Sequence, residues 1–297
     1  MKVHIYTDIA SLFGQACRIW MTVLVEAGHE VELVDMGMTT DKPLPAVGTA
    51  DLNLLVTGIF AFERFKAWGL PARGKNVLWM FDPLTQQREA TMHSHKWLAF
   101  DAIAAQLDAV IAMDASIASY VRTWHPTLPT LQIPYLVAEQ AITKPLAESE
   151  RNGQVLLMGG HTPRRAAVEE ALQGVGVATE FLWAGVWGAE RHQKRQRSRI
   201  SLNIHADPVH TYFDQFRTLE AWAAGTVVVT ESTDGLQPWG VVPGVHLAMA
   251  DLNALPPMCV ELLADAPRRA QMTREARDLL RAQFSPKRWR QDMLSIL

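Results

Sequence analysis

The stretch that decides the fold is Ser201–Ser232, SLNIHADPVHTYFDQFRTLEAWAAGTVVVTES. Its pattern predicts a short strand over 201–205, a helix that begins near Asp214 and a β-branched strand over 226–230. Gly225 is expected to end the helix, because glycine readily adopts the positive φ that is common at helix C-termini. The stretch therefore reads as strand, polar loop, helix and strand.

The predicted helix begins just outside the carboxyl end of a strand. Open α/β sheets bind their ligands at this place. The unpaired N–H groups and the dipole at a helix start favour an anion such as a diphosphate. Arg217 and Glu220 are three residues apart and therefore share one helical face. They offer a cation for phosphate and a carboxylate for sugar hydroxyls, although an exposed ion pair between the two is the alternative.

Strand and helix patterns alternate along the whole chain, which indicates an α/β protein with two Rossmann-like, doubly wound domains. The length of 297 residues agrees with about 150 residues per domain. We expect the two domains to face each other across a cleft. The expected parts are an N-terminal domain at 1–138, a polar linker at 139–153, a C-terminal domain at 154–284, and a terminal helix at 285–297 that could cross back.

Composition excludes several classes of protein. Hydrophobic residues make up 48% of the chain and charged residues 20%, as in a compact globular protein. A net charge of −3 disfavours duplex DNA as a substrate. Cys17 and Cys259 alone provide neither a disulfide framework nor a four-ligand zinc site. We expect a cytoplasmic location, because Lys2 is followed directly by a strand pattern and no apolar run approaches the roughly 20 residues that span a bilayer.

A second strand-to-helix turn, GGHTPRR, occupies residues 159–165. Gly159 and Gly160 allow the backbone to approach a ligand, and Arg164 and Arg165 follow where a phosphate would bind. The turn lacks the GK[ST] of a P-loop. Its alternative interpretation is a tight turn with two solvated arginines. The first turn of the chain contains only Gly14, so the dinucleotide-binding fingerprint is absent.

Four segments resemble the GT-B glycosyltransferases. LEAWAAGTVVVTES (219–232) is similar to their nucleotide-sugar-binding core, and MGGHTPRRAAVEEAL (158–172) to the turn at the start of their second domain. VEAGHEVELVD (25–35) and IPYLVAE (133–139) resemble a first-domain helix and strand and the crossing between domains. Their order and spacing match, so the resemblance covers most of the chain. FRTLEA (216–221) is most similar to the CgeB-like branch.

The resemblance implies a glycosyltransferase that moves a sugar from a nucleotide-diphosphate sugar, most simply a UDP-sugar, to an unidentified acceptor hydroxyl. It implies no metal and no further cofactor. Glu220 would hold the ribose hydroxyls, and Arg164 or Arg165 the diphosphate. Tyr212 stands where many members have a second acidic residue. The residues expected in the donor site are Gly14, Gly159, Gly160, Arg164, Arg165, His205, Tyr212, Phe213, Asp214, Arg217 and Glu220.

Candidate catalytic residues lie in loops of the first domain. Asp82 follows a buried strand and could act as the base or cap a turn, whereas His93 and His95 could act as bases or contact the acceptor. The cationic run at 192–199 is either a solvated helix face or a site for an anionic acceptor or nucleic acid. A nucleotide-sugar epimerase, a catalytically degenerate nucleotide-binding protein and a nucleic-acid base modifier remain alternatives. Acceptor, stereochemical outcome and oligomeric state stay open.

Overall fold

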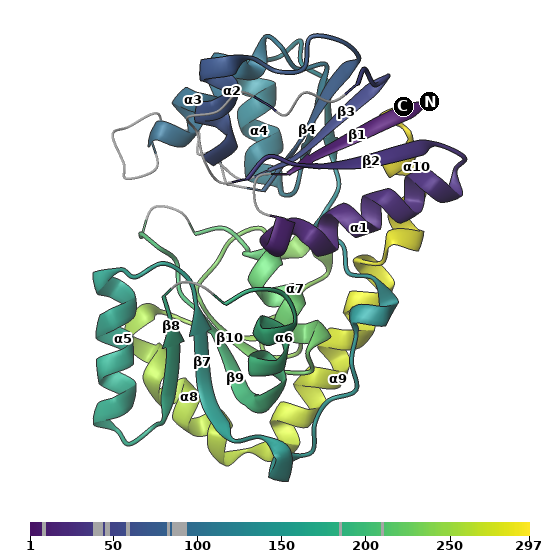
Figure 1. Cartoon of the computed structure of the whole chain (residues 1–297). Helices are drawn as coiled ribbons and strands as arrows, with labels where there is room; N and C mark the ends of the chain where they lie inside the picture. The colour runs from purple at the N-terminus through teal and green to yellow at the C-terminus, as the bar shows by residue number, and fades with distance from the viewer. Residues whose placement is uncertain are drawn as a thin grey trace. The chain divides into compact units, whose positions relative to one another are not determined.

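The computed structural model divides the chain into two compact units, shown in Figure 1. Unit 1 comprises Met1–Leu136 together with Pro286–Leu297, and unit 2 comprises Val137–Ser285. The carboxyl-terminal segment therefore belongs to the same unit as the amino terminus. The structure describes residues 1–7, 10–37, 44, 48–57, 60–81, 84, 94–183, 186–208 and 211–297.

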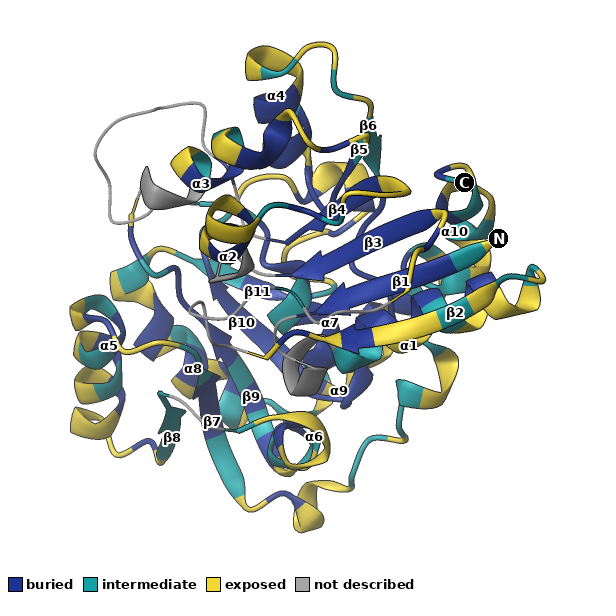
Figure 2. Ribbon diagram, turned by 45° about the horizontal axis from the view of Figure 1, so that its top comes forward, coloured by how far each residue is buried: buried dark blue, intermediate teal, exposed yellow. Residues whose placement is uncertain are grey.

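Unit 1 is built on a six-stranded sheet of order β2-β1-β3-β4-β5-β6, in which all neighbours are parallel. The strands are β1 (Lys2–Thr7), β2 (Glu30–Asp35), β3 (Leu52–Thr57), β4 (Lys75–Met80), β5 (Ala109–Ala112) and β6 (Thr130–Gln132). The helices are α1 (Ala10–Glu26), α2 (Phe60–Trp68), α3 (Ser94–Ala104), α4 (Ala115–Trp124) and α10 (Pro286–Leu294). Every residue of β3 is buried, as expected for a parallel strand covered on both faces (Figure 2).

Unit 2 contains a five-stranded parallel sheet of order β11-β10-β9-β7-β8. The strands are β7 (Gly153–Met158), β8 (Thr179–Leu182), β9 (Ser198–Asn203), β10 (Val227–Glu231) and β11 (Ala248–Ala250). The helices are α5 (Pro163–Gly174), α6 (Gly188–Arg197), α7 (Gln215–Ala223), α8 (Leu255–Ala264) and α9 (Ala266–Gln283), with the 3₁₀ turns Glu139–Ala141, Glu148–Glu150, Gln237–Trp239 and Leu252–Ala254. The strand order reverses between β7 and β9, so this is the topological switch point of the sheet.

The core of unit 2 lies between its sheet and its helices. Ile200, Val229 and Leu172 are among the residues that are nearly inaccessible to solvent there. Helix α5 contacts α8, α6 contacts α7, and both α7 and α8 contact α9. Among the residues described, no helix is both long and apolar enough to cross a membrane.

The stretch Ser201–Ser232 forms the predicted strand, helix and strand as β9, α7 and β10. Asp214 is the N-cap of α7. Gly225 has a φ of +77°, which confirms that the helix ends in a residue of positive φ. A Cβ atom on Gly225 would stand 2.9 Å from the Cβ atom of Pro145, so a larger residue would also clash there.

The segment 139–153 differs from the expected linker, because it lies within unit 2 and is tied to its elements. The Arg151 guanidinium donates hydrogen bonds of 2.7 Å to the carbonyl oxygens of Ser198 and Gly225. Arg277 donates to the carbonyl oxygen of Thr143 at 2.7 Å. In each of these contacts the donor and the carbonyl acceptor are far apart in the sequence. The local polarity and lack of periodicity of 139–153 therefore suggested a linker, whereas the segment packs against unit 2.

Candidate functional site

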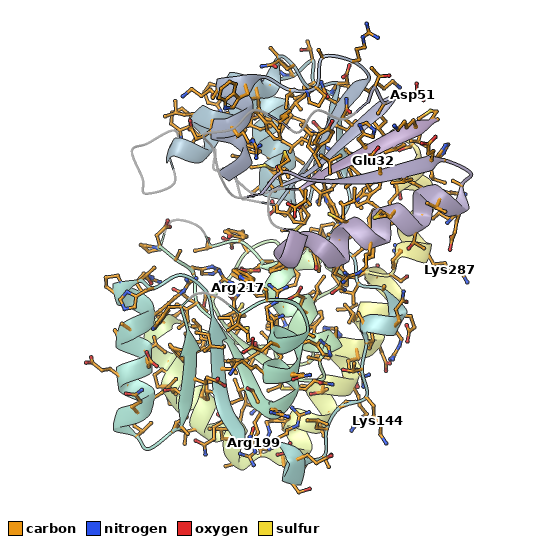
Figure 3. The ribbon with its side chains drawn as sticks, viewed as in Figure 1. Glu32, Asp51, Lys144, Arg199, Arg217 and Lys287 are labelled. Atoms are coloured by element: carbon orange, nitrogen blue, oxygen red, sulfur yellow. The ribbon has the colours of Figure 1, made fainter. Side chains whose placement is uncertain are left out.

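The candidate site lies at the carboxyl edge of the unit 2 sheet. Because β7, β9 and β10 are parallel, the residues at their carboxyl ends meet at one edge. Gly159, Asn203 and Glu231 are brought together in this way. Arg217 of α7 lies at the same edge, as Figure 3 shows.

Arg165 forms hydrogen bonds to the segments that follow β7 and β9, on the two sides of the switch point. Its Nε and Nη2 atoms donate to the Ile204 carbonyl oxygen at 3.0 and 2.7 Å, and its Nη1 atom donates to the Gly160 carbonyl oxygen at 2.6 Å. The side chain is buried, which contradicts the alternative of a solvated arginine. Burial lowers the pKa of Arg165 to about 10, and the positive charge of Arg217 acts in the same direction. Arg165 therefore stays charged at neutral pH.

Arg217 supplies a second guanidinium group beside the Gly159 turn. Its Nη1 atom donates to Oδ1 of Asn203 at 3.0 Å and lies 3.3 Å from Oδ2 of Asp214. A Cβ atom on Gly159 would stand 3.0 Å from Nη1 of Arg165 and 3.5 Å from Nη2 of Arg217. The positively charged guanidinium groups of Arg165 and Arg217 therefore both lie close to Gly159. This arrangement favours an anion near the turn.

The start of α7 is already partly occupied by a side chain. Oδ1 of Asp214 accepts a 2.9 Å hydrogen bond from the backbone N–H of Arg217. One of the N–H groups predicted to be available for an anion is therefore capped. Tyr212 precedes the N-cap residue Asp214 by two positions, and its ring centroid lies 6.1 Å from that of His205. Phe213 is buried against Trp222, so its side chain serves the core.

His205 and Arg164 both contact Glu231 at the end of β10. The backbone N–H of His205 donates to Oε2 of Glu231 at 3.2 Å, and Arg164 forms an ion pair with Oε1. Nε2 of His205 lies 3.1 Å from the Ser232 carbonyl oxygen, which requires the proton on that nitrogen. Burial lowers the pKa of His205, although the charge of Glu231 opposes the shift. His205 is thus held by hydrogen bonds within the protein, as is typical of a histidine with a structural role.

Glu220 points to helix α6. Its Oε1 atom accepts a 2.7 Å hydrogen bond from Nη2 of Arg191, and its Oε2 atom is paired with Nη1 of Arg195. All three side chains are buried. Arg191 and Arg195 are four residues apart and so share one helical face. The interpretation of the run 192–199 as a solvated face is therefore wrong for Arg195, and Arg191 at its border is buried with it.

Several residues at this edge were missed from the sequence. Arg191, Arg195, Asn203 and Glu231 hold the predicted site residues in place, but none of them was assigned to the site from the sequence. The sequence signal that could have identified Arg191 and Arg195 was their four-residue spacing on a helix that precedes the motif at 219–232. Their partner, 25 to 29 residues away, could not be identified from spacing.

Of the predicted site residues in unit 1, Gly14 lies within the described part of the chain. Gly14 lies inside α1, which begins at Ala10, rather than in a loop. Asp82 and His93 lie outside the described residues, and His95 belongs to α3 with a side chain that is not described. Their catalytic roles stay predictions. Within the described part of the chain, no group of three or more His, Cys, Asp or Glu side chains is placed to hold a metal ion.

The chain is similar to known proteins in its sequence family and in its fold. The family described as glycosyl transferase-like matches residues 141–295, which is 155 of the 297 residues. No curated protein is significantly similar to the chain in sequence.

Solved structures share the fold at low sequence identity. Sucrose-phosphate synthase from Thermosynechococcus elongatus has a TM-score of 0.69 at 15% identity, with 100% of this chain and 98% of that chain covered. Anabaena HepE in complex with UDP-glucose has a TM-score of 0.69 at 14% identity, with both chains covered completely. A DNA-modifying β-glucosyltransferase has a TM-score of 0.60 at 11% identity over 99% of each chain.

These matches do not test the CgeB-like branch, which stays a prediction. The family match covers most of unit 2, including the Gly159 turn and the helix of Glu220. The structural matches extend over both units. The chain belongs to the glycosyl transferase-like family and is a glycosyltransferase of the GT-B fold.

Proposed function

We propose that the chain transfers a sugar from a UDP-sugar to an acceptor hydroxyl, with the nucleotide bound at the carboxyl edge of unit 2. The observation that carries this proposal is the approach of Arg165 and Arg217 to Gly159 at the switch point of the sheet. A diphosphate is the anion that such a doubly cationic turn suits. The choice of UDP is supported by the similar Anabaena HepE, whose structures contain UDP-glucose or UDP.

The two arginines have different tasks in this proposal. Arg217 is partly exposed and contacts the diphosphate, whereas Arg165 is buried and holds the turn in shape through the Gly160 and Ile204 carbonyl oxygens. Negative charge grows on the leaving UDP as the bond to the sugar breaks. A guanidinium fixed in advance stabilises that charge without reorganisation. We propose that these cations make a bound metal unnecessary.

Glu220 binds the ribose in the same proposal. Arg191 contacts one carboxylate oxygen of Glu220, and Arg195 contacts the other. Because a carboxylate oxygen accepts more than one hydrogen bond, we place the ribose hydroxyls at the same carboxylate. The arginines fix the orientation of the carboxylate, so little ordering is required when the nucleotide binds.

The acceptor hydroxyl is activated from unit 1 in this proposal, with Asp82 as the first candidate base and His93 and His95 as alternatives. A general base has to reach the hydroxyl within hydrogen-bond distance. Replacement of Asp82 by Asn tests the assignment, because a lost base lowers kcat by about 100-fold or more with little effect on UDP affinity. An unchanged kcat would remove Asp82 from the mechanism.

The central experiment is UDP titration by calorimetry on the wild type and on Arg217→Gln. The matched control is Arg199→Gln, because Arg199 is exposed to 27% and Arg217 to 29%, and each pairs with one carboxylate. Arg199 lies at the amino end of β9, and Figure 3 shows it far from Arg217 within unit 2. We expect Arg217→Gln to weaken UDP binding by about tenfold or more. Equal affinities of the two variants would refute the placement of the diphosphate.

A further inference from the structure

Asn203 is a buried side chain that contacts both the sheet and Arg217. It is the last residue of β9 and is paired with Thr230 of the neighbouring strand β10. Only 4% of the residue is exposed to solvent. Its Oδ1 atom accepts a 3.0 Å hydrogen bond from Nη1 of Arg217, and its Nδ2 atom donates to Oγ1 of Thr230 at 3.2 Å. A partly exposed arginine is thus connected to the core of the sheet.

Thr230 determines which end of the Asn203 amide faces Arg217. The Thr230 hydroxyl donates its single proton to the carbonyl oxygen of Glu231 at 3.1 Å. Its oxygen can therefore only accept a hydrogen bond from Asn203, which requires the NH₂ group of the amide on that side. The carbonyl end of the amide is left to face Arg217. That is the end a guanidinium can use, because a guanidinium only donates.

Asn203 holds Arg217 without adding charge. Nη1 of Arg217 already lies 3.3 Å from a carboxylate oxygen of Asp214. The other end of the guanidinium, Nη2, is 3.5 Å from the place that a Cβ atom on Gly159 would take. A second carboxylate at position 203 would oppose an anion beside Gly159 by like-charge repulsion. A neutral amide provides the same acceptor oxygen and leaves the positive charge of the turn in place.

We propose that Asn203 is a positioning residue for the donor diphosphate, which it serves by holding Arg217 in its binding orientation. The inference rests on the proposed function, in which Arg217 contacts the diphosphate. An arginine side chain loses rotamer freedom when it becomes ordered on a ligand. A guanidinium that Asn203 holds in advance loses less of it on binding, so the diphosphate binds more tightly. Asn203 acts through Arg217 and makes no contact with the nucleotide itself.

A purely structural role gives a different expectation. The amide could serve only to join β9 to β10 through Thr230. In that case Asn203→Ala would lower the melting temperature, and the folded variant would bind UDP as the wild type does. A general disturbance of the site would weaken UDP and uridine, which lacks the phosphates, to the same extent.

The test is a double-mutant cycle of UDP affinities with Asn203→Ala, Arg217→Gln and the combination of the two. We expect Asn203→Ala to weaken UDP binding about fivefold in the wild type and to have no further effect beside Arg217→Gln, since residues that act through one another are not additive. Titrations with uridine, followed by NMR, should give the same affinity for all variants. Thermal melting of each variant separates lost binding from lost folding.

Two further variants separate charge from orientation. Thr230→Val keeps a similar shape but removes the acceptor that orients the amide, so UDP binding should weaken several-fold, whereas Thr230→Ser should bind as the wild type does. The matched control is Thr57→Val, because Thr57 is also a buried threonine at the carboxyl end of a parallel strand, β3 of unit 1. Asn203→Asp keeps the acceptor oxygen and adds a negative charge, so it should weaken UDP binding more than Asn203→Ala.

Three results would overturn the inference. They are unchanged UDP affinity in both Asn203→Ala and Thr230→Val, losses that add fully in the double-mutant cycle, and equal losses for UDP and uridine. Failure of the wild type to bind UDP, or an Arg217→Gln variant that binds it as Arg199→Gln does, would instead refute the proposed function. A weakened Arg217→Gln variant beside unaffected Asn203→Ala and Thr230→Val variants refutes the positioning role alone.

Discussion

Replacement of Glu220 by Gln should cost more stability than the removal of most single charges from this protein. Glu220 faces Arg191 and Arg195, and the three side chains are exposed by only 8%, 8% and 4%. The glutamine keeps the shape of the side chain and one acceptor oxygen. It removes the negative charge that faces two guanidinium groups, which are exposed to solvent by only 8% and 4%.

The expected loss follows from the burial of the pair. Breaking a buried ion pair by removing one partner costs about 3–5 kcal/mol, because an uncompensated charge stays behind. We expect the lower end, about 3 kcal/mol, since the glutamine oxygen still accepts one hydrogen bond. In a domain of this size that loss lowers the melting temperature by roughly 6–12 °C.

The assay is urea unfolding followed by circular dichroism and by tryptophan fluorescence. Glu148→Gln is the matched control, because Glu148 also bridges arginines but is 48% exposed. Its contacts with Arg199 and Arg269 are 3.3 and 2.6 Å long. Although Arg269 is only 5% exposed, water reaches the carboxylate of Glu148 and screens its ion pairs, so the control should lose less. A Glu220→Gln variant no less stable than Glu148→Gln would refute the argument from burial.

Three further predictions concern other parts of the chain. Gly225→Ala should lower the free energy of unfolding by about 1–3 kcal/mol more than Gly176→Ala, since both glycines have a φ of +77° but only the Gly225 methyl group would meet Pro145; equal losses in urea unfolding would contradict this. Burial lowers the folded-state pKa of His205 below its ordinary 6.5, so the unfolded state binds more protons and stability should fall as the pH drops below about 6.5. Replacement of His205 by Gln should reduce that slope in melting experiments between pH 7 and 5, and an unchanged slope would assign it to other groups. Sugar transfer should persist in EDTA, because guanidinium groups offset the diphosphate charge; a loss that added Mg²⁺ or Mn²⁺ restores would show that the reaction needs a metal.

Local patterns were sufficient for the strand, helix and strand of Ser201–Ser232. The β-branched run at 226–230, the glycine at 225 and the helix start near Asp214 are each determined by residues within a few positions, and the structure forms them as expected. The same holds for the Gly159 turn, where the glycine leaves room for the Arg165 guanidinium.

The partners of the charged residues could not be predicted. Arg191 and Arg195 look like part of a solvated run until α6 is placed against α7. Arg151 likewise appears to belong to a polar linker, although its carbonyl partners lie 47 and 74 residues away. Ion-pair partners depend on tertiary placement, which spacing along the chain does not encode.

The donor site itself is tested most directly by hydrogen–deuterium exchange with and without UDP. A nucleotide bound at the carboxyl edge of unit 2 should slow exchange in the turn at 159–165 and in the first turn of α7, which begins at Gln215. The amino ends of β7 and β9 should exchange unchanged. Protection by UDP confined to unit 1, or the absence of protection at a UDP concentration that saturates binding, would contradict the account.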